Sequence, residues 1–239
     1  MSRPYLSIII PAYNEAKRLP ITLIDIDRHL AKVDFSYEIL VVNDGSTDTT
    51  AELVRRLEPL INNLKLIDNL ENRGKGAVVK QGMLIAKGNY RLFMDADNST
   101  AIIEFHKMTP YFQEGYDVII GSRRVLGAQM KPSQPFLKMF LGMLGNYWIQ
   151  LWVLRGIQDT QAGFKCFSAE AAENIFSKLH EERWAFDIEA LALARLLGYH
   201  VKEIPIFWVN DLRTHVKSSA YLQVLWQTVK IWWRLRRIK

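Results

Sequence analysis

The chain has 239 residues, 49% of them hydrophobic, which is enough to bury a substantial core as one α/β domain or two small ones. Its single cysteine, Cys166, excludes an intramolecular disulfide and fits a reducing compartment. Six basic residues and no acid lie from Lys217 onward, so this tail accounts for the net charge of +6, and the remaining charges cancel. The apolar run that ends at Pro11 is too short for the core of a signal peptide.

Short apolar runs alternate with segments of helical length through the first half of the chain. The runs predict strands at Leu6–Ile10, Glu38–Val42, Leu64–Ile67, Tyr90–Met94 and Asp117–Ile120. The intervening segments predict helices at Leu19–Ala31, Thr49–Leu60, Gly76–Ala86 and Ile102–Gln113. This alternation predicts an α/β fold with a mostly parallel sheet flanked by helices, and such sheets bind ligands beyond the carboxyl ends of their strands.

The first two predicted strands are each followed by polar side chains that suit a nucleoside. Pro11 is expected to stop the first strand, after which Tyr13 offers a flat stacking face and Glu15 an acceptor. In Asn43-Asp44-Gly45-Ser46-Thr47-Asp48, Asp44 can hydrogen-bond a base or ribose, while the later residues can cap the next helix. A plain strand-to-helix turn is an equal alternative for the first of these segments.

The third predicted strand leads into Asn72-Arg73-Gly74-Lys75-Gly76, which opens a helix. Backbone N–H groups at a helix start, with two cations nearby, suit a phosphate. The spacing is not that of a P-loop, and no G-x-G-x-x-G is present, which disfavours a dinucleotide oxidoreductase.

Asp95-Ala96-Asp97 directly follows the buried strand Tyr90–Met94. Two carboxylates at a strand end can turn toward one hard cation, Mg²⁺ or Mn²⁺, which takes oxygen ligands from carboxylates and substrate phosphates. Taken alone, such a pair is more often a solvated turn. Arg123, after the fifth strand, is either a structural ion-pair partner or a fork-shaped donor to a phosphate.

The second half of the chain carries two acids among apolar residues. Asp159 lies in the segment Gly156–Lys165, and Asp187 lies in Glu182–Glu189, which leads into a helix. Each is either a buried capping residue or a functional acid.

These motifs, in this order, resemble family 2 glycosyltransferases of the GT-A fold over nearly the whole chain. PAYNE, NDGSTD, NRGKG, DAD and GSR stand in the family's order, and GIQDTQAGFKCF and ERWAFDIEAL are similar to the dolichyl-phosphate β-glucosyltransferase branch, close kin of the dolichyl-phosphate mannose synthases. The resemblance implies a GT-A catalytic domain over residues 1–217.

The resemblance also implies the substrates and the roles of the motif residues. The donor would be a nucleotide sugar, UDP-glucose being favoured, and the acceptor a polyprenyl monophosphate, with inversion at the anomeric carbon. Asp95 and Asp97 would bind Mg²⁺ or Mn²⁺. Arg123 and Lys138 would hold the acceptor phosphate, and Asp187 matches the region of the acidic base candidate. The donor would be bound by Pro11, Tyr13, Glu15, Asp44, Lys75 and Asp95.

Two segments predict contact with a membrane surface. Phe136–Leu154 approaches the length of a transmembrane helix, but Lys138, Asn146 and Gln150 interrupt it. It is therefore expected to be an interfacial or hairpin segment (residues 136–154) on the acceptor side, with a plain core helix pair as the alternative.

The tail predicts a basic amphipathic helix over residues 218–239. A helix with tryptophan and leucine on one face and basic residues at its end suits an anionic bilayer. Nucleic acid is the rival partner, disfavoured because the chain carries no nucleic-acid motif. We expect peripheral attachment to the cytoplasmic face of a membrane.

Three functions compete on this evidence. The first is a metal-dependent polyprenyl-phosphate glucosyltransferase. The second is another family 2 transferase, using GDP-mannose or acting on a glycan. The third is a non-catalytic membrane-binding homologue, which the intact Lys75, Asp95, Asp97 and Arg123 disfavour.

Overall fold

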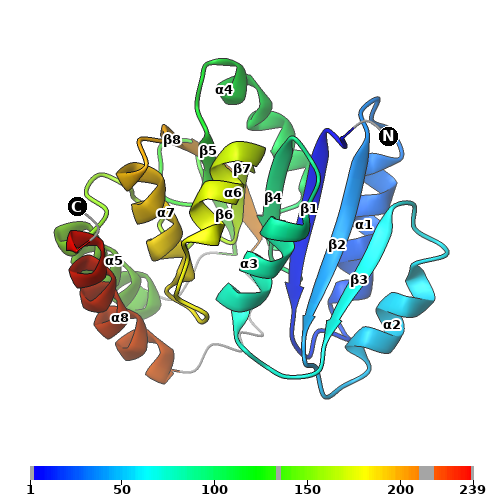
Figure 1. The fold of residues 1–239 in the computed structure, drawn as a ribbon, viewed down its shortest axis with the longest axis horizontal. Helices are drawn as coiled ribbons and strands as arrows, with labels where there is room; N and C mark the ends of the chain where they lie inside the picture. The colour runs from blue at the N-terminus through cyan, green and yellow to red at the C-terminus, as the bar shows by residue number, and fades with distance from the viewer. Residues whose placement is uncertain (1–2, 133–135, 210–217, 238–239) are drawn as a thin grey trace.

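The computed structural model describes residues 3–132, 136–209 and 218–237, and the side chains of 136–141 and 218–222 lie outside that description. Its main sheet has seven strands: β1 (Leu6–Ala12), β2 (Tyr37–Asp44), β3 (Leu64–Asn69), β4 (Tyr90–Met94), β5 (Val118–Ser122), β7 (Phe164–Ser168) and β8 (Val201–Pro205). They lie in the order β3-β2-β1-β4-β7-β5-β8 (Figure 1). Only β7 runs antiparallel to its neighbours, so the predicted mostly parallel α/β sheet is confirmed.

Helices cover both faces of this sheet. Along β1, Ile9 faces one core while Ile8 and Ile10 face the other, because successive side chains of a strand point to opposite faces. A second, two-stranded parallel sheet pairs β6 (Gln129–Lys131) with β9 (Phe207–Val209). The helices around the main sheet include α1 (Leu19–Leu30), α2 (Thr50–Leu57), α3 (Lys75–Ile85), α6 (Ala169–Ser177) and α7 (Phe186–Leu196).

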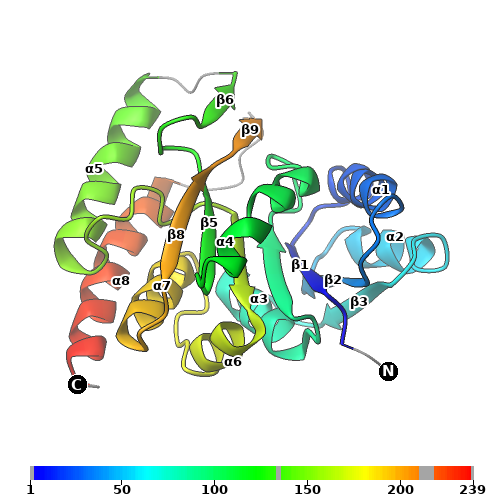
Figure 2. The ribbon, with the colours of Figure 1, turned by 90° about the horizontal axis from the view of Figure 1, so that it is seen from above.

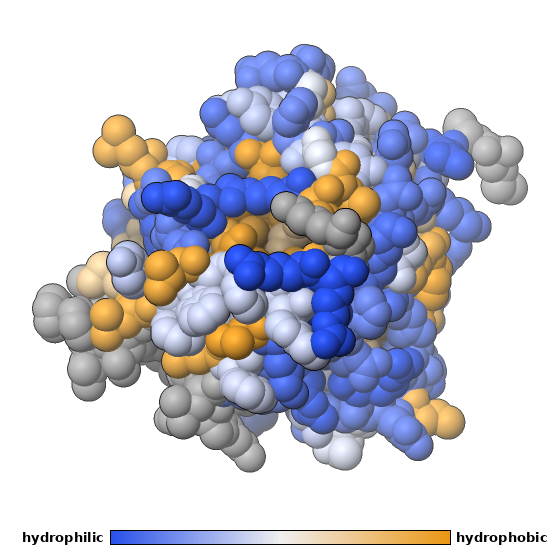
Figure 3. Space-filling view, turned by 60° about the vertical axis from the view of Figure 1, so that its left-hand side comes forward, coloured by the Kyte–Doolittle hydropathy of each residue, from blue (hydrophilic) through white to orange (hydrophobic). Residues whose placement is uncertain are grey.

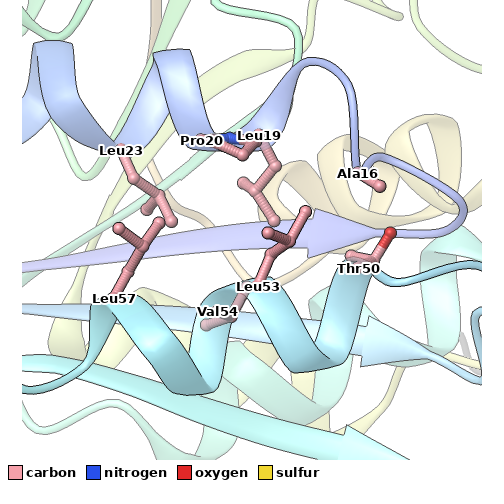
Figure 4. Close-up of a pocket in the computed structure, with 8 residues that line it drawn as sticks. All are labelled: Ala16, Leu19, Pro20, Leu23, Thr50, Leu53, Val54 and Leu57. Atoms are coloured by element: carbon pink, nitrogen blue, oxygen red, sulfur yellow. The ribbon is translucent and has the colours of Figure 1, made fainter.

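On one of these faces, α1 packs against α2. Figure 4 shows Leu19 and Leu23 of α1 pointing toward Leu53 and Leu57 of α2. The seam between the two helices leaves no room for a water molecule. It therefore fixes the relative position of the loops that precede these helices, which are the loops that follow β1 and β2.

Strand β1 continues beyond its predicted end at Ile10, so the expectation that Pro11 stops the strand is wrong. Pro11 stays in register with Val42 of β2, whereas pairing with β4 has already ended at Ile9. Proline, which lacks an N–H, is tolerated where the ladder requires no donor from it. The ends of the other predicted strands, and of the first three predicted helices, lie within three residues of the observed ends.

The single helix predicted for Ile102–Gln113 is instead two short ones. A 3₁₀-helix, η1 (Ile102–Lys107), is followed by α4 (Thr109–Gln113). Pro110 lies in the first turn of α4 and has no N–H to bond a carbonyl of the preceding turn. One long helix across this proline is therefore disfavoured.

The segment expected to be interfacial forms one continuous helix, α5 (Phe136–Trp152), so the hairpin option is wrong. It packs against α8 (Ser218–Arg236): Trp148 Nε1 donates to the Leu225 carbonyl at 3.3 Å, and the rings of Trp152 and Trp232 lie 5.1 Å apart. The two helices lie side by side, at the opposite end of the molecule from α1 and α2 (Figure 2). Among the described residues, no helix combines the length and the apolarity needed to cross a membrane.

Candidate active site

The loops after β1 and β2 are joined by a network centred on Asn14. Its φ of 56° lies in the left-handed region, which asparagine tolerates better than most residues. The Asn14 N–H donates to Ser46 Oγ at 2.9 Å, and Asn14 Oδ1 accepts from the Thr47 N–H at 2.9 Å. Asp48 accepts from the Thr50 N–H at 2.9 Å, so this segment does support the start of α2.

The residues predicted to hold the nucleoside differ in how accessible they are. Pro11 is buried within β1, whereas the Tyr13 side chain is 45% exposed and can offer its ring to a base. The carboxylate of Glu15 bonds the Arg18 guanidinium, with Arg18 Nε donating at 2.7 Å. The Glu15 N–H donates to Thr50 Oγ1 at 2.8 Å, which again joins the two loops.

Asp44 binds the loop between β3 and α3. Its carboxylate accepts from the backbone N–H groups of Arg73 at 2.8 Å and Gly74 at 2.9 Å, and from Asn72 Nδ2 at 3.0 Å. Burial raises the pKa of Asp44, although these hydrogen bonds oppose that shift. The carboxylate thus orders the loop that leads to Lys75, and its contact with a base or ribose stays a prediction.

The start of α3 is covered by a segment from the second half of the chain. A Cβ at Gly74 would lie 2.6 Å from the Glu182 carbonyl oxygen, and a Cβ at Gly76 would lie 2.5 Å from the Glu181 carbonyl oxygen. The Ala77 N–H donates to the Glu182 carbonyl at 2.9 Å. Both glycines are therefore required by close backbone approach, and one N–H of the expected phosphate cradle already has a partner.

Lys75 forms an ion pair with Asp95, its Nζ lying 2.5 Å from Asp95 Oδ1. Burial alone would lower the pKa of Lys75, but the carboxylates of Asp95 and Asp187 outweigh it and raise this pKa. The Asp95 N–H donates to the Gly163 carbonyl at 3.1 Å. The structure thus places Lys75 and Asp95 together, as a site for a diphosphate and its cation requires.

Asp97 lies two residues beyond Asp95 in a partly buried setting. Its Oδ1 accepts from the Ser99 N–H at 3.0 Å, and its Oδ2 lies 3.8 Å from Arg18 Nη1. Burial raises the pKa of Asp97, and the nearby Asp95 carboxylate raises it further. Two carboxylates that repel each other fit a hard divalent cation that also takes ligands from substrate phosphates. The described residues hold no group of three or more His, Cys, Asp or Glu placed to bind a metal.

Arg123 has a structural partner, Asp159. The guanidinium bonds both carboxylate oxygens at 2.8 Å, and the Arg123 N–H adds a third bond at 2.9 Å. Burial would raise the pKa of Asp159, but Arg123 reverses the shift and lowers it. The guanidinium also lies 5.3 Å from the Trp208 ring centroid. Arg123 stays 22% exposed, so binding of an acceptor phosphate stays a prediction.

Asp187, in the first turn of α7, is paired with a lysine that sequence reasoning missed. Lys165 Nζ donates to Asp187 Oδ1 at 2.6 Å and to the Ala162 carbonyl at 2.5 Å, and its side chain is fully buried. Burial raises the pKa of the Asp187 carboxyl and lowers that of Lys165. The sequence does hold a signal for this pair: Lys165 is a single charge within the apolar run of residues 164–167. A lysine buried in such a strand needs a carboxylate partner.

Lys138, predicted to hold the acceptor phosphate, and Lys217, where the basic tail begins, fall outside the described side chains. Lys138 lies in the first turn of α5, and Lys217 lies in the undescribed segment 210–217. Of the remaining predicted residues, Lys75, Asp95, Arg123 and Asp187 act on one another electrostatically and form one cluster.

The arrangement matches a known family and a known fold. Residues 7–176 match the model of "Glycosyl transferase family 2". Among solved structures, glucosyl-3-phosphoglycerate synthase from Mycobacterium tuberculosis superposes with a TM-score of 0.70 at 16% identity, in a complex with Mn²⁺, UDP-glucose and phosphoglyceric acid. The alignment covers 96% of this chain and 80% of that one. At this identity the likeness shows the fold alone, which is the expected GT-A fold.

Comparison with curated relatives identifies the branch of this family to which the chain belongs. "Dolichyl-phosphate beta-glucosyltransferase" of Dictyostelium discoideum is 39% identical over 86% of this chain and 67% of its own length. The enzyme of the same name from Drosophila melanogaster is 35% identical over 98% of this chain and 78% of its own. The human enzyme of that name is 34% identical over 86% of this chain and 67% of its own length. The chain therefore belongs to glycosyl transferase family 2 and, within it, to the family of the dolichyl-phosphate β-glucosyltransferases.

Proposed function

We propose that this glycosyltransferase moves glucose from UDP-glucose to the phosphate of a polyprenyl monophosphate, with inversion at the anomeric carbon. The observation that carries the proposal is the cluster of Lys75, Asp95, Arg123 and Asp187 in a chain whose relatives bear the name dolichyl-phosphate β-glucosyltransferase. A UDP-sugar donor is supported by the fold neighbour described with UDP-glucose.

Asp95 and Asp97 would hold Mg²⁺ or Mn²⁺, which, when bound, would neutralise charge on the departing diphosphate. Lys75 is placed to add a positive charge at the same end of β4, because its ammonium lies against Asp95. Tyr13 and the loop ordered by Asp44 would receive the uridine. These roles concern binding and charge stabilisation of the donor.

The acceptor needs little help from a base. A phosphate monoester has a second pKa of about 6, so its oxygen is already anionic near neutral pH. Asp187 is bonded to the Lys165 ammonium, which supports a role in orienting cationic groups and not in proton removal. Arg123, held by Asp159, would align the acceptor phosphate for in-line attack.

Peripheral membrane attachment at the cytoplasmic face belongs to the same proposal. Large apolar side chains are exposed on the outer sides of α5 and α8: Met143, Leu144, Tyr147, Leu151, Trp226 and Trp233. The view that brings this side of the molecule forward has hydrophobic side chains among strongly hydrophilic ones (Figure 3). Such a mixture of tryptophan, aliphatic and basic side chains suits an anionic bilayer surface.

The decisive experiment offers the purified protein labelled UDP-glucose or GDP-mannose with polyprenyl phosphate in vesicles, with and without EDTA, and extracts the lipid. We expect labelled lipid from UDP-glucose only, and none after EDTA. Labelled lipid from GDP-mannose would favour a mannose synthase, and no lipid product from either donor would refute the proposal.

The matched variants for this experiment are Asp97→Asn and Asp34→Asn. Asp97 is a proposed ligand, whereas Asp34 is an exposed carboxylate between α1 and β2, at the opposite end of the strands. We expect Asp97→Asn to lose transfer by about 100-fold or more, as for other residues that stabilise developing charge. Asp34→Asn should retain the wild-type rate.

A further inference from the structure

One basic residue of the C-terminal helix faces inward. Arg234 Nη1 lies 2.7 Å from Glu189 Oε1, and its Nη2 lies 3.0 Å from Glu181 Oε1. The Glu189 side chain is only 1% exposed and that of Glu181 9%, so the guanidinium compensates two largely buried carboxylates. Arg234 therefore ties α8 to the body of the enzyme and does not serve as a free membrane-facing charge.

These carboxylates are fastened to the segment that leads into α7. Glu189 Oε2 accepts from the backbone N–H groups of His180 at 2.8 Å and of Glu181 at 2.6 Å. His180 Nδ1 lies 3.5 Å from Glu189 Oε1 and contributes charge only when protonated. Arg234 is thus the permanently charged partner of a carboxylate that orders this segment.

The same segment lies on the start of α3. The carbonyls of Glu181 and Glu182 press against Gly76 and Gly74, and Glu182 accepts from the Ala77 N–H at 2.9 Å. A few residues further on, α7 begins at Phe186, next to Asp187. A continuous set of direct contacts therefore runs from α8 to the proposed diphosphate end of α3 and to the start of α7.

The outer side of α8, next to Arg234, carries an exposed stripe. Trp226, Lys230 and Trp233 recur at helical spacing, and Arg237 follows one residue beyond the end of α8; the two tryptophans are 61% and 54% exposed. Lys230 Nζ lies 5.5 Å from the Trp226 ring centroid, and the Arg237 guanidinium lies 3.3 Å from that of Trp233. One helix thus presents a stripe suited to anionic lipid outward, and at the edge of that stripe Arg234 reaches the carboxylates of the body.

We propose that Arg234 is a positioning residue that couples the seating of α8 on an anionic membrane to the order of the donor site. The inference rests on the proposed function, because it takes the start of α3 as the diphosphate site. A lipid surface that holds α8 in place would stabilise the Glu181–Glu182 segment and, through it, the start of α3. Coupling of this kind is reciprocal: lipid should tighten nucleotide binding by the factor by which nucleotide tightens lipid binding.

The test compares Arg234→Gln with Arg56→Gln, a matched change at an exposed arginine of α2, at the opposite end of the molecule from α8. The UDP dissociation constant is measured by calorimetry with Mn²⁺, with and without saturating vesicles of phosphatidylcholine and phosphatidylserine. We expect vesicles to lower it about fivefold or more for the wild type and for Arg56→Gln. For Arg234→Gln we expect vesicle binding to be kept and this tightening to be lost.

Enzyme kinetics and thermal melting distinguish a positioning role of Arg234 from a general loss of folding. In Arg234→Gln the KM for UDP-glucose should rise severalfold in the presence of vesicles while kcat changes little, and Arg234→Lys should recover part of the loss. Arg234→Gln leaves the buried Glu189 carboxylate without its cationic partner. The double variant, Arg234→Gln combined with Glu189→Gln, removes that unpaired negative charge. We expect the double variant to melt cooperatively and still lack the tightening.

Three outcomes would overturn the proposal. In the first, Arg234→Gln, alone or combined with Glu189→Gln, keeps the wild-type tightening. In the second, the wild type forms lipid-linked glucose but binds UDP equally well with and without vesicles, so the proposed function stands and only the coupling fails. In the third, the wild type binds no UDP under any condition, and both proposals fail together.

Discussion

At the scale of single residues, the Asp95 carboxylate is positioned by groups far from it in the chain. Lys75 Nζ lies 2.5 Å from one oxygen, and the backbone of Asp95 donates to the Gly163 carbonyl. A Cβ on Gly163 would lie 1.9 Å from Asp95 Oδ2. Because no side chain fits there, residue 163 must be glycine if Asp95 is to keep its place.

Gly163→Ala should therefore impair the reaction without unfolding the protein. The new methyl group must displace the Asp95 carboxylate, and we expect kcat/KM for UDP-glucose to fall about tenfold or more, equivalent to about 1.4 kcal/mol. Gly145→Ala in α5 is the matched control, because a Cβ there meets no atom within 4 Å. Wild-type kinetics in Gly163→Ala would contradict the assignment of Asp95.

The raised pKa of Asp97 predicts that metal binding depends on pH. Burial and the neighbouring Asp95 raise its pKa, so a bound proton competes with the cation at low pH. Mn²⁺ affinity in the presence of UDP should rise as pH increases through this raised pKa and then level off. Titration by electron paramagnetic resonance tests this, and the dependence should be weaker in Asp97→Asn.

The same shift has a consequence for the metal-free protein. A carboxyl whose folded-state pKa is raised contributes stability below its ordinary pKa of about 3.9, and that contribution is lost as pH rises through the raised value. At neutral pH, Asp97→Asn should therefore melt at a higher temperature than the wild type without metal. A lower melting temperature would show that the hydrogen bond from the Ser99 N–H outweighs the repulsion from Asp95.

At the scale of elements, α8 has two faces with different tasks. Val224, Thr228 and Ile231 are buried against the body, whereas Trp226 and Trp233 are exposed. The amphipathic pattern predicted one face with all the tryptophans, but Trp232 packs against Trp152 of α5 and lies on the inner side. A helix that packs on one side and leaves aromatic rings exposed on the other is suited to lie between a protein surface and a bilayer.

The combined variant Trp226→Ala and Trp233→Ala should weaken vesicle binding. Losing two large apolar side chains should cost about tenfold or more in the partition coefficient, since burying one such side chain contributes about 1.5–3 kcal/mol. Cosedimentation with vesicles measures it, and Leu60→Ala, at an exposed position beyond α2, is the control. Unchanged cosedimentation would remove α8 from the proposed membrane surface.

At the scale of the whole molecule, the antiparallel strand β7 joins the two halves of the chain into one site. It lies between β4 and β5, in register with both, so Lys165 pairs with Phe93 on one side and Ile120 on the other. This brings Lys165 and Gly163 beside Asp95 and Asp187. Ligand binding at this junction should therefore stabilise both halves together.

UDP with Mn²⁺ should raise the melting temperature of the entire protein in a single transition. At a ligand concentration of about 100 times its Kd, the stabilisation is about 2.7 kcal/mol. For a chain of this length that corresponds to about 5–10 °C. Differential scanning calorimetry checks it, with GDP as the comparison: an equal shift with GDP would contradict the preference for a uridine nucleotide.

The sequence by itself determined the parallel α/β frame and the order of the motifs along it. Short apolar runs such as Tyr90–Met94 predict strands, because the strands of a parallel sheet are covered on both faces and need apolar side chains on both. Polar residues directly after such strands lie together at one edge of the sheet. Lys75, Asp95 and Asp97 could therefore be assigned to one site from their places after strands, with the resemblance of the motifs supplying their chemistry.

Only the tertiary structure decided which of these side chains pair with which. The bond of Arg123 to Asp159, of Asp187 to Lys165 and of Arg234 to Glu189 each joins residues far apart in sequence. Local pattern carries no information on such pairs, because a charge in an apolar run indicates burial but does not identify its partner. The partner follows from strand order and helix packing, which depend on the chain as a whole.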